Sequence, residues 1–284
     1  MEIYLYKLGL EGVIDIEQYC NNNNIVVEDV TYLNCSYNQL TELKGLDKLL
    51  NLEYLSCSNN KLTELDVSNL VNLDTLNCSK NKLSEIKGLD KLVNSKVLYC
   101  GNNKLTELDV SKLVNLEQLV CYTNQLTELN VSNLVNLEYL SCGNNKITKL
   151  DVSKLLNLEY LSCGNNKITK LDVGKLVKLE RLVCDTNQLT ELDVGKLVNL
   201  AWLWCYSNQL TELDVSKLVN LKGLDCYNNQ LTELDLSNLV NLKRLNGEEY
   251  IQPEPEQDKL DLILSKVEKL EKIISELTKG KQWK

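Results

Sequence analysis

Histidine is absent from the 284 residues of this chain. Without an imidazole, the Ser–His–Asp and Cys–His arrangements of nucleophilic enzymes are excluded, and so is the usual general base at neutral pH. No other pair of nucleophile and base can be assigned, and no Gly-x-Gly-x-x-Gly or P-loop sequence is present. We therefore expect a protein that is not an enzyme and that needs no cofactor.

Positive charge is also scarce. Lys and Arg number 31 against 40 Asp and Glu, a formal net charge of −9, whereas nucleic-acid binding needs clustered positive charge. No apolar run approaches the length of a transmembrane helix. The first residues, Met-Glu-Ile-Tyr-Leu-Tyr-Lys, lack the basic and apolar regions of a signal peptide. We expect a cytoplasmic protein that has no membrane span and binds no nucleic acid.

Cysteine, by contrast, is abundant and regularly spaced. Ten of the eleven cysteines, from Cys35 to Cys226, recur at steps of 21 or 22 residues. Each lies in one frame, Leu-x-x-Leu-x-Cys-x-x-Asn-x-Leu, as in residues 200–210. Repeats of this length are typical of a solenoid, in which each unit buries its apolar face against the next. Ser95 stands where the neighbouring repeats have leucine, so we expect a local weak point there.

This frame resembles the leucine-rich repeat family, with Cys replacing one leucine. The length and sequence of the repeat are most similar to those of the internalin-like class of bacterial repeats, which have 21 or 22 residues. The resemblance implies an α/β repeat fold, a right-handed solenoid with a parallel β-sheet on its concave face and short helical or 3₁₀ turns on its convex face. Alternation within the frame indicates that Leu and Cys point inward, and the recurring Asn is expected to bond backbone groups where the chain leaves the sheet.

Four segments follow from this pattern. Residues 1–29 match no repeat and are interpreted as an N-terminal cap, with a short helix at residues 12–20 and a strand at residues 25–27. Residues 30–246 form the solenoid of ten to eleven repeats. A linker containing two prolines is expected at residues 247–255, and an amphipathic helix at residues 256–284.

The C-terminal helix has two interpretations that the sequence leaves open. Its apolar residues alternate at spacings of three and four, which is a short heptad pattern. One interpretation is a coiled coil that joins copies of the chain into a homo-oligomer. The other is a cap that folds over the last repeat. The heptad residues are Leu260, Ile263, Val267, Leu270, Ile274 and Leu277.

Metal binding is not expected. The repeated cysteines occupy an inward position, where Cys acts as a small apolar residue, and no Cys-x-x-Cys pair exists. Cys20 lies outside the frame, so its burial cannot be inferred. Glutamate recurs after the strand in most repeats, as at Glu191, Glu212 and Glu233, and Lys149 and Lys170 interrupt the row. This row is interpreted as a hydrated rim, with the steering of a basic partner as the alternative.

Large aromatic side chains occupy many outward positions of the predicted strands. Such residues, together with Arg, are enriched where proteins bind one another. We therefore predict a non-enzymatic scaffold that binds a protein or peptide on its concave face. The alternatives are an assembly protein that associates through the heptad helix and a glycan-binding surface. The predicted anchor residues are Trp202, Trp204, Tyr206, Tyr227, Arg181, Tyr160 and Tyr139.

Overall fold

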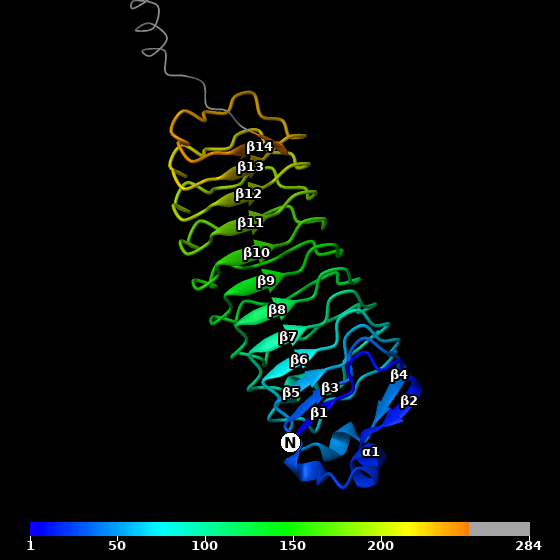
Figure 1. Ribbon diagram of the computed structural model, residues 1–284. Helices are drawn as coiled ribbons and strands as arrows, with labels where there is room; N and C mark the ends of the chain where they lie inside the picture. Colours follow the sequence, from blue (N-terminus) through cyan, green and yellow to red (C-terminus); the bar gives the residue numbers. More distant parts are fainter. Residues whose placement is uncertain (250–284) are drawn as a thin grey trace, which may run out of the picture. The chain divides into compact units, whose positions relative to one another are not determined.

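The computed structural model describes residues 1–249. One sheet runs through the repeats, its strands follow one another in chain order, and the strands of the repeats pair in parallel (Figure 1). The strands are β1 (Glu2–Tyr4), β3 (Tyr32–Asn34), β5 (Tyr54–Ser56), β6 (Thr75–Asn77), β7 (Val97–Tyr99), β8 (Gln118–Val120), β9 (Tyr139–Ser141), β10 (Tyr160–Ser162), β11 (Arg181–Val183), β12 (Trp202–Trp204), β13 (Gly223–Asp225), β14 (Arg244–Leu245) and β15 (Glu248–Glu249). The predicted parallel-sheet solenoid is confirmed.

Neighbouring strands pair without any stagger. Leu161 of β10 pairs with Leu182 of β11, and Leu182 pairs with Leu203 of β12. This register places equivalent side chains of successive repeats directly beside one another, about 4.8 Å apart. Each outward position of the repeat therefore becomes a column of side chains along the sheet.

The core contains the Leu and Cys positions of the frame, as predicted. The ten repeated cysteines are at most 5% exposed, and all of them are free thiols. Cys20, whose burial the sequence left open, is also buried, on helix α1 (Ile16–Asn22). Ser95 is buried too, and its hydroxyl donates to the carbonyl of Leu73. The expected loss of apolar contact is therefore accompanied by a satisfied polar group.

A column of asparagines marks the point where the chain leaves the sheet. Asn166 is representative: its Nδ2 donates to the carbonyls of Cys142 (3.1 Å) and Cys163 (3.0 Å), and its Oδ1 accepts from the amide of Ile147 (3.0 Å). The residue before each of these asparagines has φ between 51° and 57°. The predicted role of this column, which we call the inner asparagine column, is confirmed. Its members are Asn38, Asn60, Asn81, Asn103, Asn124, Asn145, Asn166, Asn187, Asn208 and Asn229.

A second, outer asparagine column was not predicted. Its members are at least partly exposed, and each donates from Nδ2 to a carbonyl of the preceding repeat, as Asn157 does to Val135 (3.1 Å). Lys178 takes the place of one member and donates to Oδ1 of Asn157 (2.9 Å). The sequence signal was the recurring Leu-Val-Asn-Leu. The column comprises Asn72, Asn94, Asn115, Asn136, Asn157, Asn199, Asn220 and Asn241.

The segments that return from one strand to the next contain little helix. Short 3₁₀ helices occur in the two 22-residue repeats, at η2 (Leu46–Lys48) and η3 (Leu89–Lys91). Each follows a glycine with φ near 75°, Gly45 or Gly88, a conformation open to glycine. The 21-residue repeats instead use hydrogen-bonded turns, such as the one from the amide of Leu113 to the carbonyl of Val110 (3.0 Å).

The N-terminal segment differs from its prediction in two places. Residues 11–15 form strand β2 (Glu11–Asp15), which pairs with β4 (Gln39–Lys44), so the helix begins only at Ile16. Asp15 caps that helix by accepting from the amide of Gln18 (3.0 Å). The strand predicted at residues 25–27 is wrong, because the 3₁₀ helix η1 (Val27–Asp29) begins there. Pairing with β4 supplies the hydrogen bonds that a longer helix would otherwise have made internally.

The same segment also extends the sheet. Strand β1 pairs with β3, with Ile3 opposite Leu33. The predicted amphipathic helix of residues 256–284, with its heptad residues, lies outside the described residues, as does the linker beyond Glu249. In the part of the chain that the structure describes, no helix has the length and apolar character to cross a bilayer.

Candidate functional site

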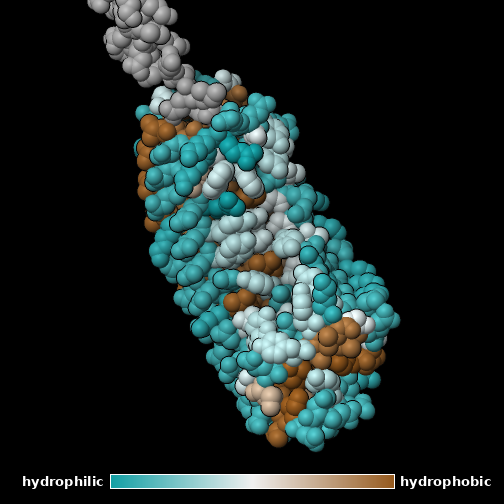
Figure 2. Space-filling model, in the orientation of Figure 1, coloured by the Kyte–Doolittle hydropathy of each residue, from teal (hydrophilic) through white to brown (hydrophobic). Residues whose placement is uncertain are grey.

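The outward side of the strands, here called the sheet face, carries the predicted aromatic residues. All eleven aromatic side chains assigned to outward strand positions are at least partly exposed: Tyr32, Tyr37, Tyr54, Tyr99, Tyr122, Tyr139, Tyr160, Trp202, Trp204, Tyr206 and Tyr227. Figure 2 shows residues of intermediate hydropathy gathered along the sheet, with hydrophilic residues along its margins. The sheet face therefore presents a broad surface of intermediate polarity in this view.

Four of the predicted residues form a continuous ladder across β9 to β12. Tyr139 and Tyr160 stack with ring centroids 4.2 Å apart and planes within 4°. The guanidinium carbon of Arg181 lies 6.0 Å from the centroid of Tyr160 and 5.6 Å from that of Trp202. The arginine is thus held between two aromatic rings by cation–π contacts.

The other three predicted residues adjoin this ladder. Trp204 also contacts the guanidinium of Arg181, whose carbon lies 5.6 Å from the ring centroid. Tyr206 and Tyr227 stack with centroids 4.7 Å apart and planes within 3°. The structure therefore brings all seven predicted residues together on β9 to β13 and the turns that follow. We call this group the aromatic cluster.

Gly223 explains how Trp202 is seated, and the sequence reading missed it. A Cβ atom at Gly223 would lie 2.4 Å from Cε3 and Cζ3 of Trp202, so the indole lies directly against the backbone of β13. Trp202 and Gly223 are paired in the sheet register. Only glycine leaves room for the ring in this position.

Replacing Gly223 with alanine is expected to displace the Trp202 indole. The added methyl group would overlap two ring carbons, and the near-UV circular dichroism of the tryptophans should change. Gly195→Ala is the matched control, because a Cβ there meets its nearest neighbour, Oδ1 of Asp193, at an ordinary 3.5 Å. An unchanged near-UV spectrum for Gly223→Ala would contradict the seating of Trp202 on β13.

Two tyrosine hydroxyls of the cluster, those of Tyr206 and Tyr139, stay protonated well above neutral pH because their pKa values are raised. Burial raises the pKa of Tyr206 to about 12, with further contributions from the charge of Asp185, its hydrogen bond to the hydroxyl, Tyr227 and Asp225. Burial and the neighbouring Tyr160 raise the pKa of Tyr139 to about 12. These hydroxyls can therefore both donate and accept hydrogen bonds, and the carboxylates make the surroundings of Tyr206 negative.

A second group of tyrosines lies at the N-terminal end of the sheet. Tyr32 stacks on Tyr54 at 4.4 Å, and Tyr4 tilts against Tyr32 at 5.0 Å. Tyr6 meets Tyr37 edge-on at 5.4 Å. The sequence reading assigned Tyr4 and Tyr6 to the cap and did not place them beside the repeats. Their alternation in Tyr-Leu-Tyr is the signal that would have indicated a strand.

A hollow of about 400 Å³ opens on the sheet face beside the aromatic cluster. Its walls include Val183, Asp185 and Tyr206, and its lining includes Ser162 and two glycines, Gly143 and Gly164. We call it the sheet-face hollow. It was not predicted, because it arises where side chains are small rather than where a conspicuous residue stands.

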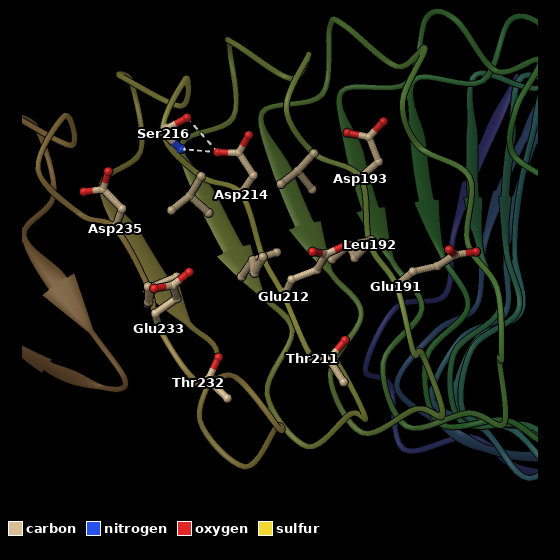
Figure 3. Close-up of a pocket in the computed structure, with 14 residues that line it drawn as sticks. Glu191, Leu192, Asp193, Thr211, Glu212, Asp214, Ser216, Thr232, Glu233 and Asp235 are labelled. Carbon is tan, nitrogen blue, oxygen red and sulfur yellow. Dashed lines mark hydrogen bonds between the residues drawn. The ribbon is translucent and has the colours of Figure 1, made fainter.

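Another cavity, with a volume of about 1020 Å³, lies away from the aromatic cluster and is open and acidic. Figure 3 shows its carboxylates in two rows, the glutamates Glu191, Glu212 and Glu233 and the aspartates Asp193, Asp214 and Asp235. Asp214 accepts hydrogen bonds from the amide (3.0 Å) and hydroxyl (2.6 Å) of Ser216, and these bonds lower its pKa. Several aspartates of this row are therefore engaged in local turns.

This acidic trough does not have the arrangement of a metal centre. Within residues 1–249, no group of three or more Cys, Asp or Glu side chains is placed to hold a metal ion. The carboxylates instead recur once per repeat, beside the return segments rather than around a common point. The trough contributes negative potential to one side of the repeats.

Comparisons with known proteins agree with this architecture. The family described as "Leucine Rich repeats (2 copies)" matches residues 28–91 through two overlapping matches and residues 135–196 through two more. The functional domain of InlJ from Listeria monocytogenes, described as including a cysteine ladder, is 44% identical with a TM-score of 0.76. That alignment covers 77% of this chain and 49% of InlJ, so the chain spans about half the length of that structure. A search of curated proteins found no match.

Two further solved structures are informative. The internalin InlF from Listeria monocytogenes is 25% identical with a TM-score of 0.55, over 78% of this chain and 82% of InlF. The ectodomain of the plant receptor kinase GASSHO1/SCHENGEN3 from Arabidopsis thaliana, in complex with CASPARIAN STRIP INTEGRITY FACTOR 2, is 25% identical. Its TM-score is 0.74, over 86% of this chain and 32% of the ectodomain.

Proposed function

This chain is a leucine-rich repeat protein of the internalin-like kind, and from that premise we propose that it is a non-enzymatic scaffold that binds a protein or peptide on the sheet face. The observation that carries the proposal is the aromatic cluster. Two tryptophans, two stacked tyrosine pairs and one arginine gather on five neighbouring repeats. The plant ectodomain of similar fold, described as a complex with a peptide factor, supports the same general use of the repeats.

The composition of the cluster favours a protein or peptide over other ligands. Trp, Tyr and Arg are the residues in which binding energy concentrates at protein interfaces. In the aromatic cluster these side chains are already packed against one another, so little side-chain entropy is lost when a partner binds. A prearranged surface of this kind can hold an extended segment along the columns of the sheet.

Replacing Trp202 and Trp204 together with alanine is expected to weaken partner binding by about 1,000-fold, because each residue is a candidate hot spot worth about 2 kcal/mol. The measurement is affinity capture with the full chain, followed by calorimetry on the captured partner. Tyr32→Ala/Tyr54→Ala is the matched control, since it removes a stacked aromatic pair from the same face but outside the cluster. A partner held equally by the Trp202→Ala/Trp204→Ala variant would contradict the proposal.

A further inference from the structure

The sheet-face hollow contains a buried carboxylate. Asp185 is only 9% exposed, yet it lines a hollow that opens to solvent. Its Oδ2 accepts a hydrogen bond from the hydroxyl of Thr186 (3.1 Å), and it is hydrogen-bonded to the hydroxyl of Tyr206. A carboxylate so far removed from water is costly unless its charge is compensated.

No cation of the described chain compensates that charge. Among residues 1–249, the ion pairs within 4.0 Å do not include Asp185. Arg181 precedes it by four residues on the same repeat, but its guanidinium is packed among Tyr160, Trp202 and Trp204. The hollow therefore presents a carboxylate that forms no ion pair with a Lys or Arg of residues 1–249.

Glycines keep the space beside this carboxylate open. A Cβ at Gly164 would lie 2.5 Å from Oδ1 of Asp185, and a Cβ at Gly143 would lie 3.0 Å from the carbonyl of Gly164. Gly143 and Gly164 occupy the outward column that holds Asp185 and Tyr206 in the next two repeats. The volume of about 400 Å³ is large enough for one long side chain.

The wall on the β12 side is aromatic. Tyr227 stacks on the side of Tyr206 that faces β13, whereas Asp185 lies on the side that faces β11. Asp225 adds a second carboxylate near the Tyr206 hydroxyl, and its Oδ1 accepts from the amide of Gly247 (2.7 Å). A cation in the hollow would thus meet one buried carboxylate and an aromatic ring.

We propose that the sheet-face hollow receives an arginine or lysine side chain of the partner, with Asp185 as the anion that binds it. This inference rests on the proposed function and adds the chemistry of one contact. Charge complementarity supports it at two scales: the hollow is lined by an uncompensated carboxylate, and the whole chain has a net charge of −9. Acidic surfaces steer basic partners toward such a site before contact is made.

The test uses the full chain labelled at its valine methyl groups, because Val183 lines the hollow. The probe is the tripeptide acetyl-Gly-Arg-Gly-amide, with the neutral isostere acetyl-Gly-citrulline-Gly-amide as its matched control. The Val183→Ile variant identifies the Val183 signals. We expect the arginine peptide to shift these signals and to bind about tenfold more tightly than the citrulline peptide, the worth of a charge-assisted hydrogen bond.

Asp185→Asn should abolish the preference for arginine, since it removes the charge at nearly constant shape. Asp193→Asn, which removes a carboxylate from the acidic trough instead, should retain it. If Asp185→Asn does not fold, the two peptides compared on the unchanged protein still decide the matter. Equal affinities for the two peptides, no shift at Val183, or a stronger response to a neutral hexose would overturn the inference.

These outcomes are separate from those that test the proposed function. If the arginine preference is absent while Trp202→Ala/Trp204→Ala still abolishes partner binding, the hollow has another role and the scaffold proposal stands. If the tryptophan variant retains its partner, the proposed function falls whatever the tripeptides do.

Discussion

Raising the pH from 8 to 10 is expected to unfold the repeats in a steep transition. Burial raises the pKa of Cys35, Cys100 and Cys142 to about 12 and that of Cys226 to about 11. In an unfolded chain the same thiols ionise near pH 8.5, about the ordinary value for cysteine. Because the folded pKa is raised, the contribution to stability is complete below about pH 8.5 and is lost as the pH rises toward the folded pKa.

The number of thiols makes this effect large. Each thiol that is protonated in the folded state and ionised in the unfolded state lowers the free energy of unfolding by about 1.4 kcal/mol per pH unit. With ten such cysteines in the repeats, the slope approaches about 14 kcal/mol per pH unit, similar to the total stability of a typical domain. We expect a midpoint about one to one and a half units above pH 8.5, measured by far-UV circular dichroism.

The triple variant Cys121→Ala/Cys142→Ala/Cys163→Ala is the control for this assignment. It removes three of the ten repeated thiols, so the slope of unfolding free energy against pH should fall by about three tenths, whatever its stability at pH 7. Tyrosines act in the same direction, but their unfolded pKa near 10 places them later in the titration. A slope that the triple variant leaves unchanged would show that thiol ionisation is not the cause.

Asn166→Ala is expected to lower the free energy of unfolding by about 3–9 kcal/mol. The asparagine is 9% exposed, and its side chain satisfies the carbonyls of Cys142 and Cys163 and the amide of Ile147. Alanine leaves these buried backbone groups unpaired, at a cost of about 1–3 kcal/mol each. Since repeat arrays depart from two-state behaviour, urea denaturation should be accompanied by hydrogen exchange at the Ile147 amide.

Asn157→Ala tests whether the burial of an asparagine, and not the residue type alone, sets the loss of stability. Asn157 belongs to the outer column and is partly exposed, and its Nδ2 makes one bond to the carbonyl of Val135, where water can replace it. We expect a loss below about 1 kcal/mol, the net value of a single solvated hydrogen bond. Similar losses for Asn166→Ala and Asn157→Ala would mean that burial does not govern the strength of the inner column.

The contacts within the aromatic cluster followed from the repeat period. Once equivalent residues lie side by side on parallel strands, Arg181 must neighbour Tyr160 and Trp202, and Tyr227 must neighbour Tyr206. The structure confirms both contacts. The N-terminal segment has no such period to guide it, and there local propensity predicted a strand at residues 25–27 where a 3₁₀ helix lies.

The sheet-face hollow could not be predicted from the sequence alone. Its opening depends on the absence of side chains at Gly143 and Gly164, and its chemistry depends on the burial of Asp185. Glycine at an outward position has many explanations, and the exposure of an aspartate cannot be deduced from its type. Only the neighbouring side chains, Tyr206 among them, remove that carboxylate from water.

The sequence by itself determined the absence of histidine, the repeat period, the inward cysteines and the inner asparagine column. The three repeat features could be predicted because a solenoid forces each repeat to solve the same packing problem in the same way. The tertiary structure decided how the outward residues meet. It seats Trp202 on Gly223, holds Arg181 among three rings and leaves Asp185 without a cation in residues 1–249. Those outcomes depend on side chains of adjacent strands at the outward positions. The repeat frame does not fix the residue type at these positions, and contacts across the sheet determine how the side chains are placed.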